Sequence, residues 1–222
     1  MDWSALSISL KLAFWTSVLL LPLGLVLGRW LAWYPPRAAA WVHSLIFLPL
    51  VLPPTVLGYY ALLAIAPDAP LGMLWQSLSG RSLAFSFEAL LLVSLVANLP
   101  FVVQPISNSY QALDRDIYDA GRVCGLAPWS LFWRIELPLI WPGVLSATML
   151  TFTHTLGEFG VVLMVGGNLA GETRTLSIAI YDEVQALNMS AAGQMSLFLL
   201  LLAFSALLWM QWQNRRARRL ML

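Results

Sequence analysis

Two ionisable residues stand inside long apolar stretches of this sequence, where charged groups are rare. Glu158 interrupts an otherwise charge-free interval from Leu137 to Gly167, and His154 lies four residues before it. That spacing places both side chains on one face of a helix, where they can pair. An ionisable group within an apolar span is costly, and it is therefore a candidate for a functional role.

Three interpretations of Glu158 are open at this point. With Phe159 it can have a structural or gating role, and with His154 it can relay protons. As metal ligands, Glu158 and His154 are too few to complete a site, so we predict no metal centre. Direct contact between Glu158 and an anionic substrate is not expected, because like charges repel.

The sequence contains no motif for nucleotide chemistry. A phosphate-binding loop needs G-x-x-x-x-G-K-[ST], and the only lysine in the chain is Lys11. We therefore predict that the chain is not an enzyme, with no catalytic residues and no cofactor. The energy for any work that the chain performs must therefore come from a partner or from an ion gradient. Cys124 is the single cysteine, so it forms no internal disulfide.

The composition indicates what kind of element contains Glu158 and His154. Hydrophobic residues make up 59% of the chain and charged residues 10%, whereas soluble domains carry about 25% charged residues. Five intervals are nearly free of charge and long enough, or nearly so, to cross a bilayer: Leu12–Gly28, Ala38–Pro67, Ala89–Leu113, Leu137–Gly167 and Val184–Asn214. Trp30, Trp33 and Tyr34 extend the first as an interfacial belt. We predict an all-α membrane protein with about five transmembrane helices in a single domain, residues 1–222.

The basic residues orient these spans. Placing the C-terminus inside assigns nine arginines to the cytoplasmic side: Arg29, Arg37, Arg115, Arg122, Arg134, Arg215, Arg216, Arg218 and Arg219. The outside then keeps three cations, Lys11, Arg81 and Arg174. Cytoplasmic loops carry the excess of Lys and Arg, so the N-terminus is predicted outside and the C-terminus inside.

The segment between the third and fourth spans, about residues 109–138, has its own pattern. One helical face is predicted from residues spaced by three and four: Tyr110, Leu113, Ile117, Ala120 and Cys124. Gly125 follows where a helix end favours positive φ, and Pro128 suits the first turn of a second short helix that stops before Pro138. Such a pair of helices can also simply lie on the membrane surface.

The same segment resembles the "EAA" loop of binding-protein-dependent ABC importer permeases, whose pattern is E-A-A-x3-G-x9-I-x-L-P. The matching positions here are Asp119, Ala120, Gly121, Gly125, Ile135, Leu137 and Pro138. Two of them depart from the pattern, because Asp119 replaces Glu and Gly121 replaces the second Ala. The resemblance implies a type I ABC importer permease fold, in which this loop couples to a separate ATPase subunit by helix-in-groove docking.

Two further stretches narrow the resemblance. The run L-P-P-T-V-L-G-Y at residues 52–59 and the elements L-G-E-F-G at 156–160 and G-E-T-R-T at 171–175 resemble molybdate permeases, which also handle tungstate. Sulfate and thiosulfate permeases share L-G-E-F-G and remain an alternative, as does an autonomous ion-coupled carrier. The resemblance implies a homodimer with two ATPase subunits and a periplasmic binding protein in a bacterial inner membrane.

Prolines and the intramembrane acid mark the expected pathway. Pro49, Pro53 and Pro54 are expected to kink or unwind part of the second span, either as a packing kink or to line a pathway. We therefore single out Pro53, Pro54, Thr55, Glu158 and Phe159 as pathway or gate residues. In the outer loop, Arg174 either meets an anion or a docking protein, or is a solvated charge beside Glu172.

Overall fold

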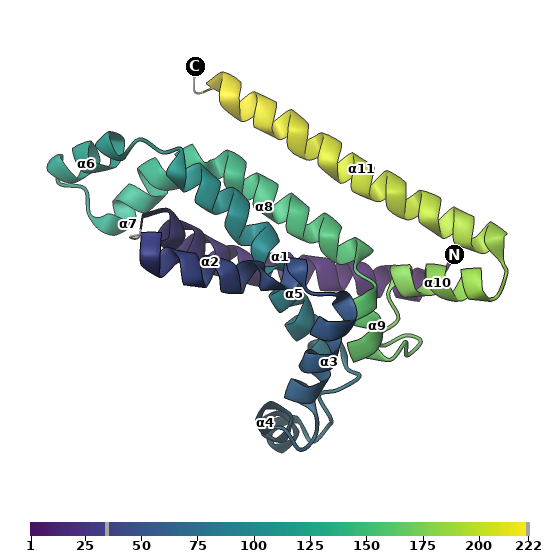
Figure 1. Cartoon of the computed structure of the whole chain (residues 1–222). Coiled ribbons are helices and arrows are strands. Elements are labelled where there is room, and N and C mark those ends of the chain that lie inside the picture. Colours follow the sequence, from purple (N-terminus) through teal and green to yellow (C-terminus); the bar gives the residue numbers. More distant parts are fainter. Residues whose placement is uncertain (34–35, 221–222) are drawn as a thin grey trace.

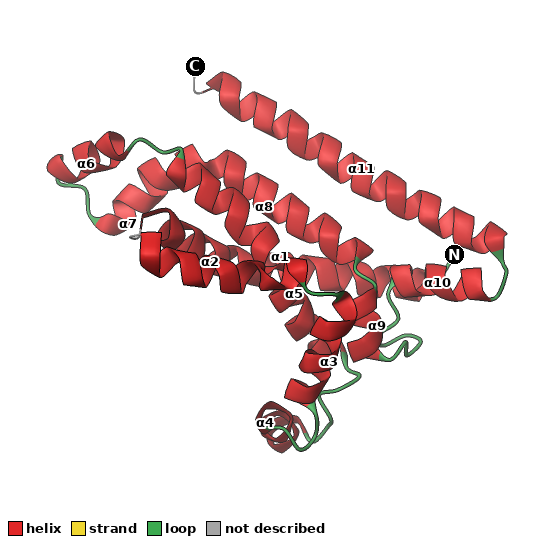
Figure 2. Ribbon diagram, viewed as in Figure 1, coloured by secondary structure: helices red, strands yellow, loops and turns green. Residues whose placement is uncertain are grey.

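Every regular element in the described part of the chain, residues 1–33 and 36–220, is a helix in this computed structural model (Figures 1 and 2). The elements follow in this order: α1 (Trp3–Trp33), α2 (Pro36–Val51), α3 (Pro54–Ile65), α4 (Pro70–Ser79), α5 (Phe87–Gln111), α6 (Arg115–Val123), α7 (Pro128–Leu131), the π-helical turn η1 (Phe132–Glu136), α8 (Leu137–Gly157), α9 (Gly160–Gly166), α10 (Leu176–Gln185) and α11 (Met189–Leu220).

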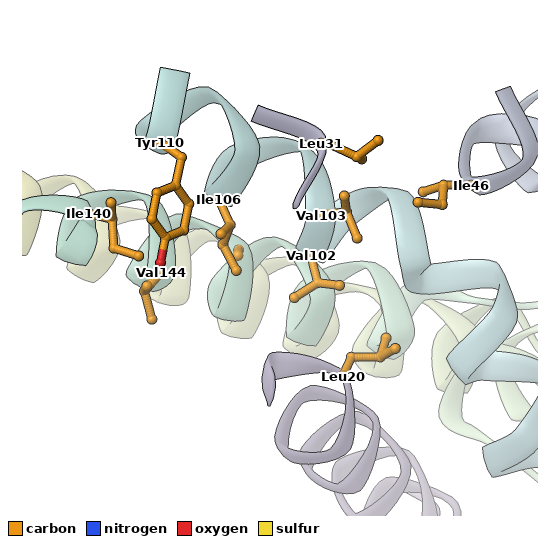
Figure 3. Close-up of a cluster of buried hydrophobic side chains, with 10 residues drawn as sticks. Leu20, Leu31, Ile46, Val102, Val103, Ile106, Tyr110, Ile140 and Val144 are labelled. Carbon is orange, nitrogen blue, oxygen red and sulfur yellow. The ribbon is translucent and has the colours of Figure 1, made fainter. Parts of the chain in front are cut away.

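The centre of the fold is the packing of α1, α5 and α8. An added Cβ at Gly28 of α1 would lie 2.7 Å from Cγ2 of Ile106 on α5, so the two backbones approach closely there. Membrane helices associate through such small-residue contacts, because lipid supplies no hydrophobic drive between them. Figure 3 shows Tyr110 beside Ile140 and Val144 in the same buried cluster.

The predicted spans agree with the helices in number. Four helices in the described residues are long and apolar enough to cross a membrane, and the bent pair α2–α3 makes a fifth if it counts as one span. Tyr34 of the expected aromatic belt lies outside the described residues, as do the side chains of Arg37 and of the four C-terminal arginines. The two termini lie at opposite ends of the bundle (Figure 1), as an odd number of spans requires.

Two of the predicted spans are broken. The axes of α2 and α3 meet at 109° around Leu52 and Pro53, because proline lacks the N–H that would continue the helix. The charge-free interval Leu137–Gly167, which contains the fourth span, is not one continuous helix. Helix α8 ends at Gly157, Glu158 is extended with ψ of 129°, and α9 begins at Gly160. The freed carbonyl of Leu156 accepts a hydrogen bond from Ser177 Oγ at 3.0 Å.

The predicted stop before Pro138 is wrong, since Pro128–Gly157 forms one helical stretch. Proline lacks an N–H, and its ring collides with the carbonyl four residues earlier in a regular α-helix. Here the turn before it is π-helical, and the N–H of Leu137 donates to the carbonyl of Phe132 instead. A π-bulge of this kind lets the helix pass the proline without ending.

The segment before it is a separate helix. The prediction of one face from Tyr110 to Cys124 is wrong, because α5 ends at Gln111 and Asp114 caps a new helix by accepting from the N–H of Asp116. The positive φ predicted at Gly125 is confirmed at +80°, and so is Pro128 at the start of α7. Figure 1 places α6 and α7 at the end of the bundle away from the N-terminus.

Candidate functional site

The two broken spans meet at one cleft. Its volume is about 690 Å³, and its walls come from both breaks: Pro49, Leu50, Leu52 and Pro54 on one side and Gly157, Glu158, Phe159 and Gly160 on the other. Helices α3 and α9 hold the breaks together, since an added Cβ at Gly160 would lie 2.9 Å from Pro54 Cβ. Two stretches about 100 residues apart in sequence therefore form one hollow.

Glu158 is held at the wall of this cleft by polar groups of α5. Its Oε2 accepts from Ser94 Oγ at 3.2 Å and from Asn98 Nδ2 at 3.4 Å. The Glu158 side chain is 8% exposed, and Ser94 and Asn98 are fully buried. A buried carboxylate is tolerated when hydrogen bonds replace its lost water, so these two residues explain how an acid can sit at this position.

The expected contact between His154 and Glu158 is mediated by a third residue. His154 Nδ1 lies 3.0 Å from Asn98 Oδ1, and an amide oxygen can only accept, so Nδ1 carries the proton. The imidazole also stacks on Phe101 at 4.0 Å between ring centroids. Asn98 thus joins His154 to Glu158, and the described residues include no group of three ligands that could hold a metal ion.

The structure brings together some of the predicted pathway residues and not others. Pro54, Glu158 and Phe159 line the cleft, whereas Pro53 and Thr55 are exposed and lie outside its lining. Sequence reasoning missed Ser94 and Asn98. Their spacing of four within the apolar interval Ala89–Leu113 was the available signal, because it places two polar groups on one helical face.

The predicted coupling residues lie around the α6–α7 elbow. Asp119, Ala120 and Gly125 are exposed, whereas Gly121 is buried against the following helix. An added Cβ at Gly121 would lie 2.6 Å from Leu131 Cδ2 and 2.8 Å from Ile135 Cδ1. Glycine at this position therefore lets α6 pack closely on α7 and η1.

The remaining motif positions lie in the helix that follows. Ile135 belongs to η1, and Leu137 and Pro138 begin α8. The intervening Glu136 is 1% exposed and pairs with Arg29 at 2.9 Å, a contact between residues 107 apart that sequence reasoning did not identify.

Arg174, at the other end of the bundle, contacts both its own loop and helix α10. Its Nε donates to Asn168 Oδ1 at 2.7 Å and lies 3.6 Å from Asp182 Oδ2. Its charged partner is Asp182, so Arg174 is not simply a solvated charge beside Glu172. Glu172 instead lines a cleft of about 710 Å³ together with Lys11, Arg81 and Glu88.

These features define a membrane permease built on the type I ABC importer fold. The chain superposes with a TM-score of 0.77 on a chain of a bacterial alginate ABC transporter, crystallised with an alginate-bound periplasmic protein. That match covers 96% of this chain and 78% of the other at 16% identity, so it establishes the fold alone.

The family follows from sequence. Residues 21–219 match the model of the binding-protein-dependent transport system inner membrane component, and the chain belongs to this family. It is 41% identical to the molybdenum transport system permease protein ModB of Azotobacter vinelandii, over 92% of both chains. It is 30% identical to the sulfate transport system permease protein CysW of Synechocystis, over 88% of this chain and 72% of the relative.

Proposed function

We propose that this chain is the permease subunit of an ATP-driven importer that carries molybdate, and also tungstate, across the bacterial inner membrane. The observation that carries this is the 41% identity to a molybdenum permease across almost the whole of both chains. The same class accounts for the cleft between the broken spans, since irregular backbone at membrane depth is tolerated where it lines a cavity.

Energy is proposed to come from a partner ATPase, because the sequence has no phosphate-binding loop of its own. The docking surface is the α6–α7 elbow, part of the coupling segment at about residues 109–138. Asp119 is exposed there, and Val123 is 88% exposed at the tip of α6. Ile117 on α6 and Trp129 on α7 are also exposed, at 45% and 72%, and several exposed apolar side chains at one site favour a protein contact. A second copy of the chain and a periplasmic binding protein complete the importer.

The proposed orientation has the N-terminus outside and the elbow in the cytoplasm. Lys11 and Arg81, two of the three cations expected outside, line one cleft at the end where α1 begins. Arg115 and Arg122 lie on α6 at the other end. This separation of basic residues matches the positive-inside rule.

The function is tested by reconstituting the chain with its ATPase subunit and its binding protein in lipid. We expect molybdate and tungstate, but not sulfate, to stimulate ATP hydrolysis, and the stimulation to vanish when this chain is omitted. Stimulation by sulfate instead would favour the second candidate, a sulfate permease, to which the similarity to CysW points. An ion-coupled carrier would transport without any ATPase.

Substitutions at Gly121 test the close contact between α6 and α7. Alanine places one methyl group against the flexible ends of Leu131 and Ile135, which can shift, so molybdate uptake should persist. Valine adds branches that push the helices apart, and because overpacking costs about 1–3 kcal/mol, uptake should fall at least about fivefold. Uptake of labelled molybdate by cells expressing each variant measures this. Equal uptake by both variants would show that the contact does not matter.

A further inference from the structure

A buried carboxylate joins three spans at the cytoplasmic end of the bundle. Glu136 of η1 is 1% exposed, and its two oxygens accept from Arg29 Nε at 2.9 Å and from Arg29 Nη2 at 3.0 Å. Tyr110 OH donates to Glu136 Oε2 at 3.0 Å. Arg29 belongs to α1, Tyr110 to α5, and Glu136 to the turn that opens α8. A forked guanidinium–carboxylate pair fixes geometry as well as charge.

The same guanidinium also faces the coupling helix. Arg29 Cζ lies 4.4 Å from the ring centroid of Trp33 and 5.9 Å from that of Tyr118 on α6. The Trp33 and Tyr118 rings are 5.0 Å apart, and the Trp33 and Tyr110 rings are 5.4 Å apart. Cations are attracted to aromatic faces within about 6 Å. Arg29 of the first span therefore pairs directly with the start of α8, faces an aromatic ring of α6, and reaches α5 through Glu136, to which Tyr110 also donates.

This arrangement gives α6 a second attachment to the bundle. Its first is the packing of Gly121 on Leu131 and Ile135, which joins α6 only to the helix that follows it. The second, through Tyr118, reaches α1 and α5 by way of Trp33 and Arg29. Without it, α6 would be packed only on α7 and η1 and joined to α5 solely by the three residues between the two helices, so its displacement would reach α1 only indirectly.

We propose that Arg29 is the positioning residue that ties the coupling helix to α1, α5 and α8, so that movement of α6 is passed to all three spans together. The inference rests on the proposed function. Lysine cannot replace this arginine fully, because an ammonium lacks the planar fork that engages both carboxylate oxygens and the ring faces at once.

The decisive measurement is the number of ATP molecules hydrolysed per molybdate imported by the reconstituted importer. Arg29→Gln removes the cation, and Tyr118→Ala removes the link to α6 while leaving the Arg29–Glu136 pair intact. We expect both variants to co-purify with the ATPase, and the ratio to rise at least about fivefold, the equivalent of about 1 kcal/mol of lost coupling. Arg29→Lys should fall between Arg29→Gln and the unaltered protein.

The control is the ion pair at the opposite end of the bundle. Asp182→Asn removes the charge of the carboxylate paired with Arg174, far from α6, and keeps the arginine in place, so the ratio should not change. A purely structural role for Arg29 predicts instead that Arg29→Gln lowers the amount of folded protein while Tyr118→Ala couples normally, and that result would overturn the proposal. If the unaltered importer shows no molybdate-stimulated hydrolysis, the proposed function itself fails. Normal stimulation with an unchanged ratio in both variants refutes only the role of Arg29.

Discussion

Replacing Gly157 with tryptophan is expected to abolish transport while leaving the protein folded. Gly157 ends α8 at the wall of the cleft, and an added Cβ there meets no atom within 4 Å. The first carbon of a new side chain therefore fits without displacing its surroundings. Because Gly157 lines a cleft of about 690 Å³, we expect the indole to occupy part of that volume and to narrow the cleft. Because passage depends on the open width of a pathway, molybdate uptake into proteoliposomes should fall at least about tenfold.

The matched control is Gly193→Trp. Like Gly157, Gly193 is exposed and has no atom within 4 Å of an added Cβ. It lies in another membrane helix, α11, and outside the lining of the cleft. That variant should insert and transport normally. If Gly157→Trp transports as well as Gly193→Trp, the cleft between the two broken spans is not the route of the substrate.

The second large effect is expected at Gly125. Its φ of +80° suits glycine, but asparagine and aspartate also tolerate the left-handed region. An added Cβ meets nothing within 4 Å, so neither side chain collides with the fold. Aspartate adds a carboxylate to an elbow that already carries Asp116 and Asp119 on α6. Docking in an ATPase groove would remove water from this carboxylate. Burying a charge is costly when no hydrogen-bonding or oppositely charged group replaces that water.

Comparison of Gly125→Asp with Gly125→Asn separates charge from backbone strain. We expect the aspartate variant to lose at least about tenfold in molybdate-stimulated ATP hydrolysis, and the asparagine variant to stay within about threefold of the original protein, because strain at one residue costs about 1 kcal/mol. Co-purification of the ATPase with each variant reports docking directly. Equal losses would assign the effect to strain, and full activity of both would place the ATPase contact elsewhere.

Local chemistry explains which features of the elbow were predictable. The positive φ of Gly125 and the helix start at Pro128 depend on the backbone preferences of single residues, which sequence displays directly. The bend at Pro53 follows in the same way from a missing N–H. These predictions were confirmed because each is decided within a few residues.

Features that depend on neighbouring elements were missed. Pro138 was expected to end a helix, but a π-helical turn accommodates it within a continuous helix. The break at Glu158 lies in an apolar run long enough for one span. Ser177 of α10 donates to the Leu156 carbonyl that the break frees, and Ser94 of α5 donates to the Glu158 carboxylate. The pairing of Arg29 with Glu136 joins residues 107 positions apart, and no local sequence pattern predicts such a contact.

The helix that passes Pro138 without stopping has a mechanical consequence. Its 30 residues, Pro128–Gly157, extend for about 45 Å at 1.5 Å per residue. One helical stretch therefore connects the elbow to the wall of the cleft. With the pivot near Pro128, a tilt of about 10° would carry the far end through about 8 Å over that length. That arc is comparable to the diameter of a helix backbone with its side chains, about 10 Å. If the ATPase docks at the elbow as proposed, a small tilt of this helix would therefore displace Gly157, in the wall of the cleft, by several ångströms.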